Sequence, residues 1–136
     1  MNNYKEIYFH NVYEVVLNSQ TTFNFSLANL SKHTLFSQPF SIITASNPNN
    51  IVLNLEENRL RNKLLYSKLY NEYDIHFAKG CYKEHCEKGF LVLDIPLAKS
   101  LALGRVFKQF AIFYCDTKQL RYITCEKEKV IVERKL

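Results

Sequence analysis

The chain has 136 residues, of which 47% are hydrophobic and 14% aromatic, which is enough for one domain over residues 1–136 and too little for two. It carries a net charge of +5, with neither a run of about 18 apolar residues nor a signal peptide at its start, so we expect no membrane contact and a cytoplasmic location. Basic residues are interspersed with acidic ones, which favours a solvated basic exterior and keeps weak nucleic-acid binding as the alternative.

The first third of the chain predicts one amphipathic segment and two strands. Residues 4–17 fit a helix, although the β-branched residues at their C-terminal end also fit a strand. A strand over 22–27 and a polar, irregular segment over 29–38 follow. The nearly continuous apolar run over 40–45 is typical of a central strand covered on both sides, and the turn at 47–50 ends it.

A helix is predicted over residues 55–71. Asn54 is a natural N-cap, and Glu57 three residues later completes a capping-box pattern. Asn58 and Asn62 fall on the same stripe of this helix as its large apolar residues. Because an amide buried without a partner costs roughly 1 to 3 kcal/mol, we expect both side chains to be hydrogen-bonded.

The remaining segments complete an alternating pattern. Residues 73–78 predict a strand, 79–88 a loop and 89–95 another strand. Pro96 opens a helix whose apolar side is formed by Leu103, Val106, Phe107 and Phe110. Strands are predicted over 111–115, 119–125 and 130–132. The order strand, helix, strand, strand, helix, strand predicts an α+β, ferredoxin-like split βαβ sheet with an extra N-terminal helix and a C-terminal hairpin.

Several short motifs occur in a characteristic order. They are Thr44-Ala45-x-Asn47-Pro48, Glu57-Asn58, Asn62, Gly80, Glu87-x-Gly89-Phe90-Leu91-Val92 and Phe107-x-Gln109-x-Ala111-Ile112-Phe113. In this order they resemble the small bacterial family called domain of unknown function 3293, over roughly residues 13–122. Ser46 and His85 stand where that family tends to have an aromatic residue and a tryptophan, so an aromatic platform for a ligand is weaker here.

The resemblance implies a shared polar site and no established activity. Its ligand-binding residues would be Thr44, Asn47, Asn58, Asn62, Glu87 and Gln109. If these side chains meet on one rim of the sheet, they would bind a small polar ligand, a nucleotide or an extended peptide of a partner protein. The alternative is that the amides satisfy backbone groups of the turn after the strand.

Catalysis, metal binding and cofactors receive less support from the sequence. Glu87 is the only carboxylate of the set, so no catalytic residue is predicted, and a hydrolase or nuclease would need a further acid or histidine close to it. Cys81, His85 and Cys86 form a short cluster of possible zinc ligands, but we expect all four cysteines to be free thiols. No Gly-rich phosphate loop is present, and no cofactor is predicted.

The sequence thus favours a small binding or interaction domain with a polar, amide-rich site. A nucleic-acid-binding protein that uses its basic surface and a small hydrolase or nuclease are the alternatives. Whether the protein is an enzyme stays open at this point.

Overall fold

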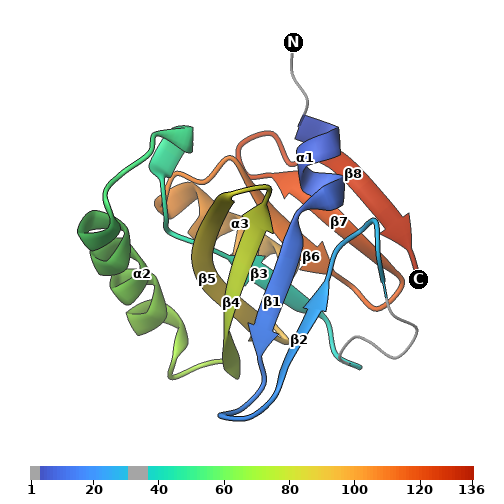
Figure 1. Ribbon diagram of the computed structural model, residues 1–136, viewed down its shortest axis with the longest axis horizontal. Helices are drawn as coiled ribbons and strands as arrows, with labels where there is room; N and C mark the ends of the chain where they lie inside the picture. The colour runs from blue at the N-terminus through green and yellow to red at the C-terminus, as the bar shows by residue number, and fades with distance from the viewer. Residues whose placement is uncertain (1–3, 31–36) are drawn as a thin grey trace.

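Eight strands form one antiparallel sheet in the computed structural model, which describes residues 4–30 and 37–136 (Figure 1). The order across the sheet is β2-β1-β4-β5-β3-β6-β7-β8. The strands are β1 (Val12–Val16), β2 (Thr22–Phe25), β3 (Phe40–Ile43), β4 (Ile75–Tyr82), β5 (His85–Leu93), β6 (Ala111–Cys115), β7 (Gln119–Thr124) and β8 (Val130–Lys135). The helical elements are α1 (Tyr4–His10), the 3-10 turn η1 (Pro48–Asn50), α2 (Leu55–Leu69) and α3 (Leu97–Val106).

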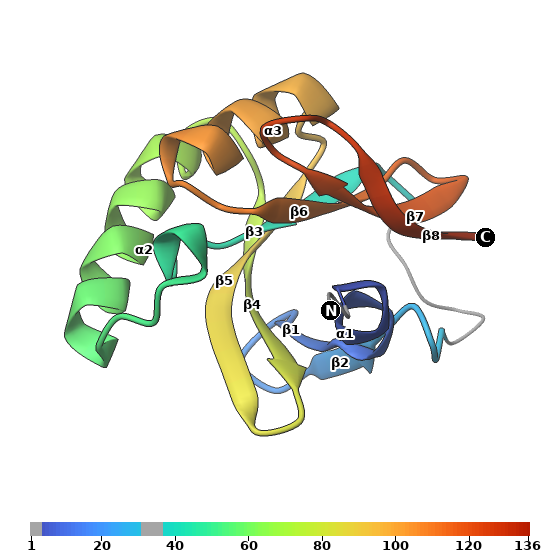
Figure 2. The same cartoon turned by 90° about the horizontal axis from the view of Figure 1, so that it is seen from above.

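The sheet curls into a half-barrel and therefore has a concave and a convex face. Figure 2 shows α1 inside the curl, whereas α2 and α3 lie outside it. Because successive side chains of a strand point to opposite faces, each central strand contributes to both sides of the sheet. The two faces consequently have separate apolar cores.

β3 belongs to both cores, since all four of its residues are buried. Ile43 packs on the convex face with Leu65 and Leu69 of α2. Phe40 packs on the concave face with Phe113 of β6. The prediction of a central strand covered on both sides is confirmed.

β4 and β5 form a long hairpin joined by a tight turn at Lys83 and Glu84. Their pairing runs from Ile75 opposite Val92 to Tyr82 opposite His85. This pairing shows that the loop predicted over 79–88 is wrong. In residues 79–88, polar side chains occur on both faces of the hairpin. The alternation of apolar and polar residues that indicates a half-buried strand is therefore missing there.

A disulfide joins Cys81 and Cys86, which lie opposite each other near the end of this hairpin. The prediction of free thiols is therefore wrong for these two residues, because the hairpin that brings them together was predicted as a loop. Cys115 and Cys125 are free and buried.

The predicted fold class is also wrong. The order of elements over residues 40–115 is the predicted one, but a ferredoxin-like sheet would have its edges at β4 and β6. Here β1 and β2 continue the sheet beyond β4, and β7 and β8 continue it beyond β6. The resulting sheet is long enough to curl around a second core on its concave face, which a ferredoxin-like fold does not have.

The ambiguous N-terminal segment divides into a helix and a strand. The helix ends at His10, and residues 12–16 form β1, as the β-branched alternative indicated. The capping box at Asn54 and Glu57 is confirmed, and so is the burial of the stripe that carries Leu65 and Leu69. Val106 is 62% exposed and does not belong to the buried side of α3, and Phe110 lies beyond the end of this helix.

The irregular segment predicted over 29–38 lies partly outside the described residues, and so does the chain start on which the signal-peptide prediction depended. Among the described residues, no helix has the length and apolar character needed to span a membrane.

Candidate functional site

The segment that follows β3 leaves the sheet and needs new partners for its backbone. Its turn contains three asparagines with positive φ angles, which are 50° for Asn47, 54° for Asn49 and 60° for Asn50. Asparagine accepts this left-handed conformation more readily than most residues. The Asn-Pro turn therefore starts where the sequence predicts it.

Two asparagines of α2 bind this segment. Asn62 accepts a hydrogen bond from the backbone N–H of Ala45 at 2.8 Å and donates to the carbonyl oxygen of Lys88 on β5 at 3.2 Å. Asn58 accepts one from the backbone N–H of Asn47 at 2.9 Å and donates to the side-chain oxygen of Asn47 at 2.8 Å. The helix is thus attached to the end of β3 through amides on its inner stripe.

Two further side chains bind the same segment, one from just beyond α3 and one from α2. Gln109, just beyond α3, donates through Nε2 to the carbonyl oxygen of Ser46 at 3.0 Å. Arg61 of α2 donates through Nε to the carbonyl oxygen of Ala45 at 2.6 Å and also reaches the carbonyl oxygen of Phe107. The segment is therefore held between α2 and the end of α3.

Glu87 and Thr44 complete the group. Asn47 donates through Nδ2 to Glu87 Oε2 at 2.8 Å, and Thr44 donates through Oγ1 to the carbonyl oxygen of Lys88 at 2.6 Å. The six residues expected to share a polar site thus meet around residues 44–47. We call Asn47, Asn58, Asn62 and Gln109 the amide cluster.

Most hydrogen-bonding groups of the amide cluster are used within the protein, as the structural alternative for these amides expected. Three nearby groups, each a hydrogen-bond acceptor or a titratable side chain, are not used in this way. Among the described residues, Glu87 Oε1, Gln109 Oε1 and the ring of His85 have no hydrogen-bond partner. These three groups line one cavity.

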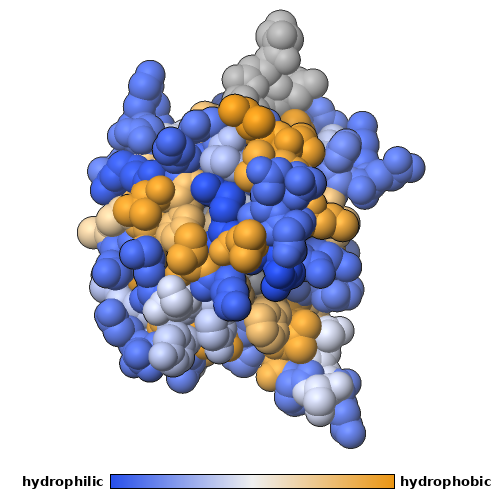
Figure 3. Space-filling view, turned by 90° about the vertical axis from the view of Figure 1, so that its left-hand side faces the viewer, coloured by the Kyte–Doolittle hydropathy of each residue, from blue (hydrophilic) through white to orange (hydrophobic). Residues whose placement is uncertain are grey.

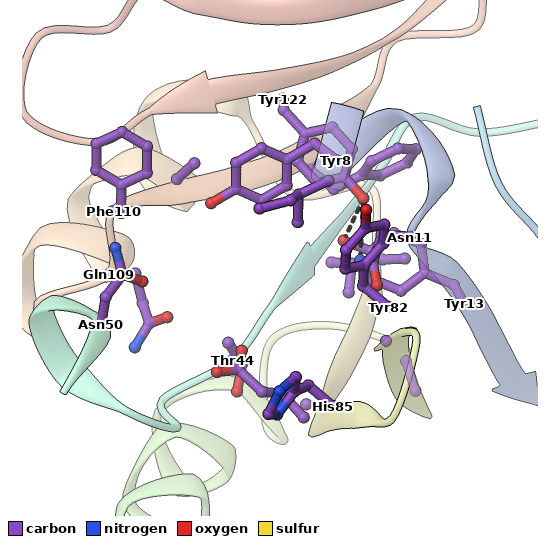
Figure 4. Close-up of a pocket in the computed structure, with 18 residues that line it drawn as sticks. Tyr8, Asn11, Tyr13, Thr44, Asn50, Tyr82, His85, Gln109, Phe110 and Tyr122 are labelled. Carbon is purple, nitrogen blue, oxygen red and sulfur yellow. Dashed lines mark hydrogen bonds between the residues drawn. The ribbon is translucent and has the colours of Figure 1, made fainter. Parts of the chain in front are cut away.

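This cavity, the concave pocket, has a volume of about 280 Å³ and lies on the concave face beneath α1 (Figure 4). Figure 4 shows Thr44 and His85 on one side of it, Gln109 and Phe110 on another, and Tyr8 across from them. Its other polar or aromatic lining residues are Asn11, Tyr13, Asn50, Tyr82, Glu87, Phe113 and Tyr122.

Glu87 is the only carboxylate that lines the concave pocket, and within the described chain no lysine or arginine lines it. The residue is exposed as a whole, but burial of its carboxyl group raises the pKa of Glu87, while the hydrogen bond from Asn47 acts in the opposite direction. A positive charge in the pocket would therefore lower the free energy of the ionised carboxylate.

A pair of buried tyrosines closes the inner end of the pocket. The hydroxyl of Tyr122 donates to the hydroxyl of Tyr13 at 2.8 Å, and Asn11 donates to Tyr122 at 3.3 Å. Burial raises the pKa of both Tyr13 and Tyr122, so that both hydroxyls are neutral at physiological pH. The inner tyrosines are therefore uncharged, and among the described residues Glu87 is the one acid of the pocket.

Sequence reasoning missed His85 as a pocket residue and considered it only as a possible metal ligand and as the replacement for the family's tryptophan. On β5, His85, Glu87 and Gly89 occupy alternate positions, so all three face the concave side. Reading residues 79–88 as a strand would have revealed this shared face. Tyr8 and Asn11 were missed as well, because nothing in the sequence indicates that α1 folds into the curl.

The possible zinc cluster is not supported by the geometry. Cys81 and Cys86 are joined in the disulfide and do not offer the thiolates that zinc requires. In the described part of the chain, no group of three or more histidine, cysteine, aspartate or glutamate residues is placed to hold a metal ion.

Comparison with known proteins gives a family and no activity. Neither a curated protein nor a solved structure matches this chain. Residues 43–112, just over half of the chain, match the family described as Protein of unknown function (DUF3293). This matched region extends from the last residue of β3 to the second residue of β6 and contains all six residues of the expected polar site. The chain therefore belongs to the DUF3293 family.

Proposed function

We propose that this protein is a binding domain whose ligand is a small organic cation, such as an amine or a guanidine, held in the concave pocket. The observation that carries this proposal is the Glu87 carboxylate, which has one oxygen without a partner and no cation beside it in a pocket lined by aromatic rings. Glu87 also forms no ion pair with another described residue.

The electrostatics of the pocket favour a positive charge. A carboxylate that has lost part of its water interacts more strongly with an opposite charge than it would in bulk solvent. The rings of Tyr8, Tyr82 and Phe110 line the same space, and the face of an aromatic ring attracts a cation by about 0.5 to 2 kcal/mol. Gln109 Oε1 supplies a second acceptor for an N–H group of the ligand.

The amide cluster has a supporting role in this proposal. Asn47 fixes the orientation of Glu87, and Asn58 and Asn62 fix the backbone on which Asn47 and Thr44 stand. Groups whose positions are fixed before binding lose less conformational entropy when the ligand arrives. The residues expected to bind a ligand thus divide into Thr44, Glu87 and Gln109, which line the pocket, and the three asparagines, which position them.

A hydrolase is the second candidate function, and one observation favours it. His85 and Glu87 line the same pocket from alternate positions of β5, which supplies the histidine that a lone carboxylate lacked. In a hydrolase, His85→Gln would abolish turnover of an ester or phosphodiester substrate. In a pure binding domain, neither the wild type nor this variant would turn over such substrates.

Nucleic-acid binding through the basic exterior would require a second site, because no lysine or arginine among the described residues lines the concave pocket.

The cytoplasmic location is also retained as part of the proposal. Since the cytosol keeps thiols reduced, thiol labelling in intact cells tests it: labelled Cys81 and Cys86 would support a cytosolic location, and protected ones would contradict it.

A thermal-shift series tests the proposed ligand class. The probes are short alkylamines and alkylguanidines, each paired with the carboxylic acid of the same carbon skeleton. A ligand present at 100 times its Kd stabilises the folded state by about 2.7 kcal/mol, so amines or guanidines should raise Tm by several degrees and the matched acids should not. Equal shifts from both series, or none from the amines and guanidines, would overturn the proposal.

A further inference from the structure

A second and larger cavity lies on the opposite face of the β4–β5 hairpin. This groove has a volume of about 660 Å³ and runs between α2 and the convex side of β4 and β5. Figure 3, which views the molecule from the side of α2, shows apolar residues there separated by strongly hydrophilic ones. We call this cavity the basic groove, and the six residues on which its chemistry depends are Arg59, Lys63, Tyr66, Phe77, Lys79 and Lys88.

Aromatic rings in the groove lie nearly parallel to one another. The ring centroids of Tyr66 and Phe77 are 6.4 Å apart with an interplanar angle of 13°, and Tyr70 continues the series with its ring 5.8 Å from that of Tyr66 at 5°. Phe77 is 63% exposed and Tyr66 is 40% exposed. These exposed rings offer flat surfaces to a planar ligand instead of filling the core.

Cations surround these rings. Arg59 and Lys63 come from α2, and Lys79 and Lys88 come from the two strands. Arg59 pairs with Glu56 and Lys79 lies 3.9 Å from Glu14, but Lys63 and Lys88 have no acidic partner among the described residues. Glu87 is the only acid among the residues that line the groove, so the groove has a net positive charge.

From this arrangement we infer that the basic groove binds a short stretch of single-stranded nucleic acid, with bases stacked on Phe77 and Tyr66 and phosphates bound by Lys63 and Lys88. Base stacking on aromatic side chains combined with a basic surface is the usual mode for single strands. An acidic peptide would use the same cations but would not need parallel exposed rings. The inference does not depend on the concave pocket, which lies on the other face of β5.

Fluorescence anisotropy with end-labelled oligo(dT) and oligo(rU) of about ten nucleotides tests the inference. Binding should weaken as salt increases, with a log–log slope of about −1.4 to −2.8 for two to four phosphate contacts. Phe77→Leu keeps an apolar side chain but removes the stacking surface, and it should weaken binding about tenfold. The double variant Lys63→Gln, Lys88→Gln should weaken binding and make the salt slope shallower by about 1.4.

Two matched variants control for general effects. Leu64→Ser changes an exposed apolar residue on α2 that does not line the groove, and Lys127→Gln with Lys129→Gln removes two exposed charges between β7 and β8. Both should bind within about twofold of the wild type. Equal losses in the controls and in the groove variants would overturn the inference.

An acidic decapeptide separates the two classes of polyanion. Binding of this peptide as tight as that of the oligonucleotides, with no loss in Phe77→Leu, would assign the groove to acidic proteins instead. Undetectable binding of both oligonucleotides at 50 mM salt would also reject the inference. Melting curves of every variant confirm that a loss of binding is not a loss of folding.

Discussion

The concave pocket and the basic groove lie on opposite faces of one hairpin and have opposite charge. Glu87 and Lys88 are neighbours in the sequence, yet the pocket is lined by the acid and by no lysine or arginine, whereas the groove is lined by four basic residues. Glu87 lines both cavities, whereas side-chain alternation along β5 places Lys88 on the groove side alone. A net charge of +5 therefore does not predict the charge of a particular cavity.

The largest expected effect comes from Asn62→Leu, which should damage both cavities together. The substitution removes the acceptor for the backbone N–H of Ala45 and the donors to Ser46 and Lys88. Leaving buried groups without partners should cost about 2 to 4 kcal/mol in the free energy of unfolding. Chemical denaturation measures this loss.

Asn71→Leu is the matched control, because Asn71 is exposed just after α2 and makes no hydrogen bond to another described residue. Its free energy of unfolding should stay within about 0.5 kcal/mol of the wild-type value. If Asn62→Leu were equally mild or stabilising, the amide cluster would be a site kept polar for use and not a structural attachment.

Glu87→Gln should separate the two cavities. Glutamine can still accept the hydrogen bond from Asn47, so the fold is retained, but the charge of the pocket is lost. Binding of an amine in the pocket should weaken at least tenfold, whereas binding of oligonucleotide in the groove should be unchanged or stronger, because Glu87 is also the one acid that lines the groove. Isothermal titration of both ligands measures the difference, and parallel losses would show that the cavities are not independent.

The difference in Tm between Glu87→Gln and the wild type should depend on pH. This effect should be smaller than the loss of amine binding, and its sign can be predicted. Because burial raises the pKa of Glu87, the folded chain holds this proton more tightly than the unfolded chain. The stabilisation is fully present below the ordinary pKa of 4.5 and is lost as pH rises through the raised pKa. The Tm of Glu87→Gln relative to wild type should therefore increase with pH, and a constant or falling difference would contradict the burial of this carboxyl.

The smallest effect is expected from the disulfide. It closes a loop over only five positions, for which loop-closure entropy gives at most about 2 kcal/mol, and the β4–β5 ladder already holds the two ends together. Cys81→Ser with Cys86→Ser should lower the free energy of unfolding by about 1 to 2 kcal/mol. Melting with and without a reductant should differ for the wild type and coincide for the double variant.

Local signals in the sequence identified most elements correctly. The capping box of Asn54 and Glu57 located α2, and the apolar run of β3 indicated a strand buried on both sides. Asn58 and Asn62 were expected to be hydrogen-bonded because buried amides on an apolar helix stripe require partners, and both are. Thr44, Glu87 and Gln109 were named only through the family resemblance, and Arg61 was not named.

What the sequence did not reveal depends on distant contacts. The curl of the sheet and the position of α1 inside it follow from strands added at both edges, for which no local pattern exists. The face of β5 that carries His85 and Glu87 was hidden because the hairpin is polar on both sides near its turn. A strand is recognised from alternating apolar and polar residues only when one of its faces is apolar, and this hairpin has no apolar face near its turn.

The position of β3 in the middle of the sheet has a consequence for synthesis of the chain. Both of its partner strands, β5 and β6, begin more than forty residues after Ile43. At about 5 to 20 residues per second, translation leaves this apolar strand without its neighbours for roughly 2 to 10 s. α2 leaves the ribosome earlier, so Asn58 and Asn62 offer the nascent strand its first specific contacts. Asn58 and Asn62 should therefore begin to order the segment that follows β3 before the sheet neighbours of β3 have been made.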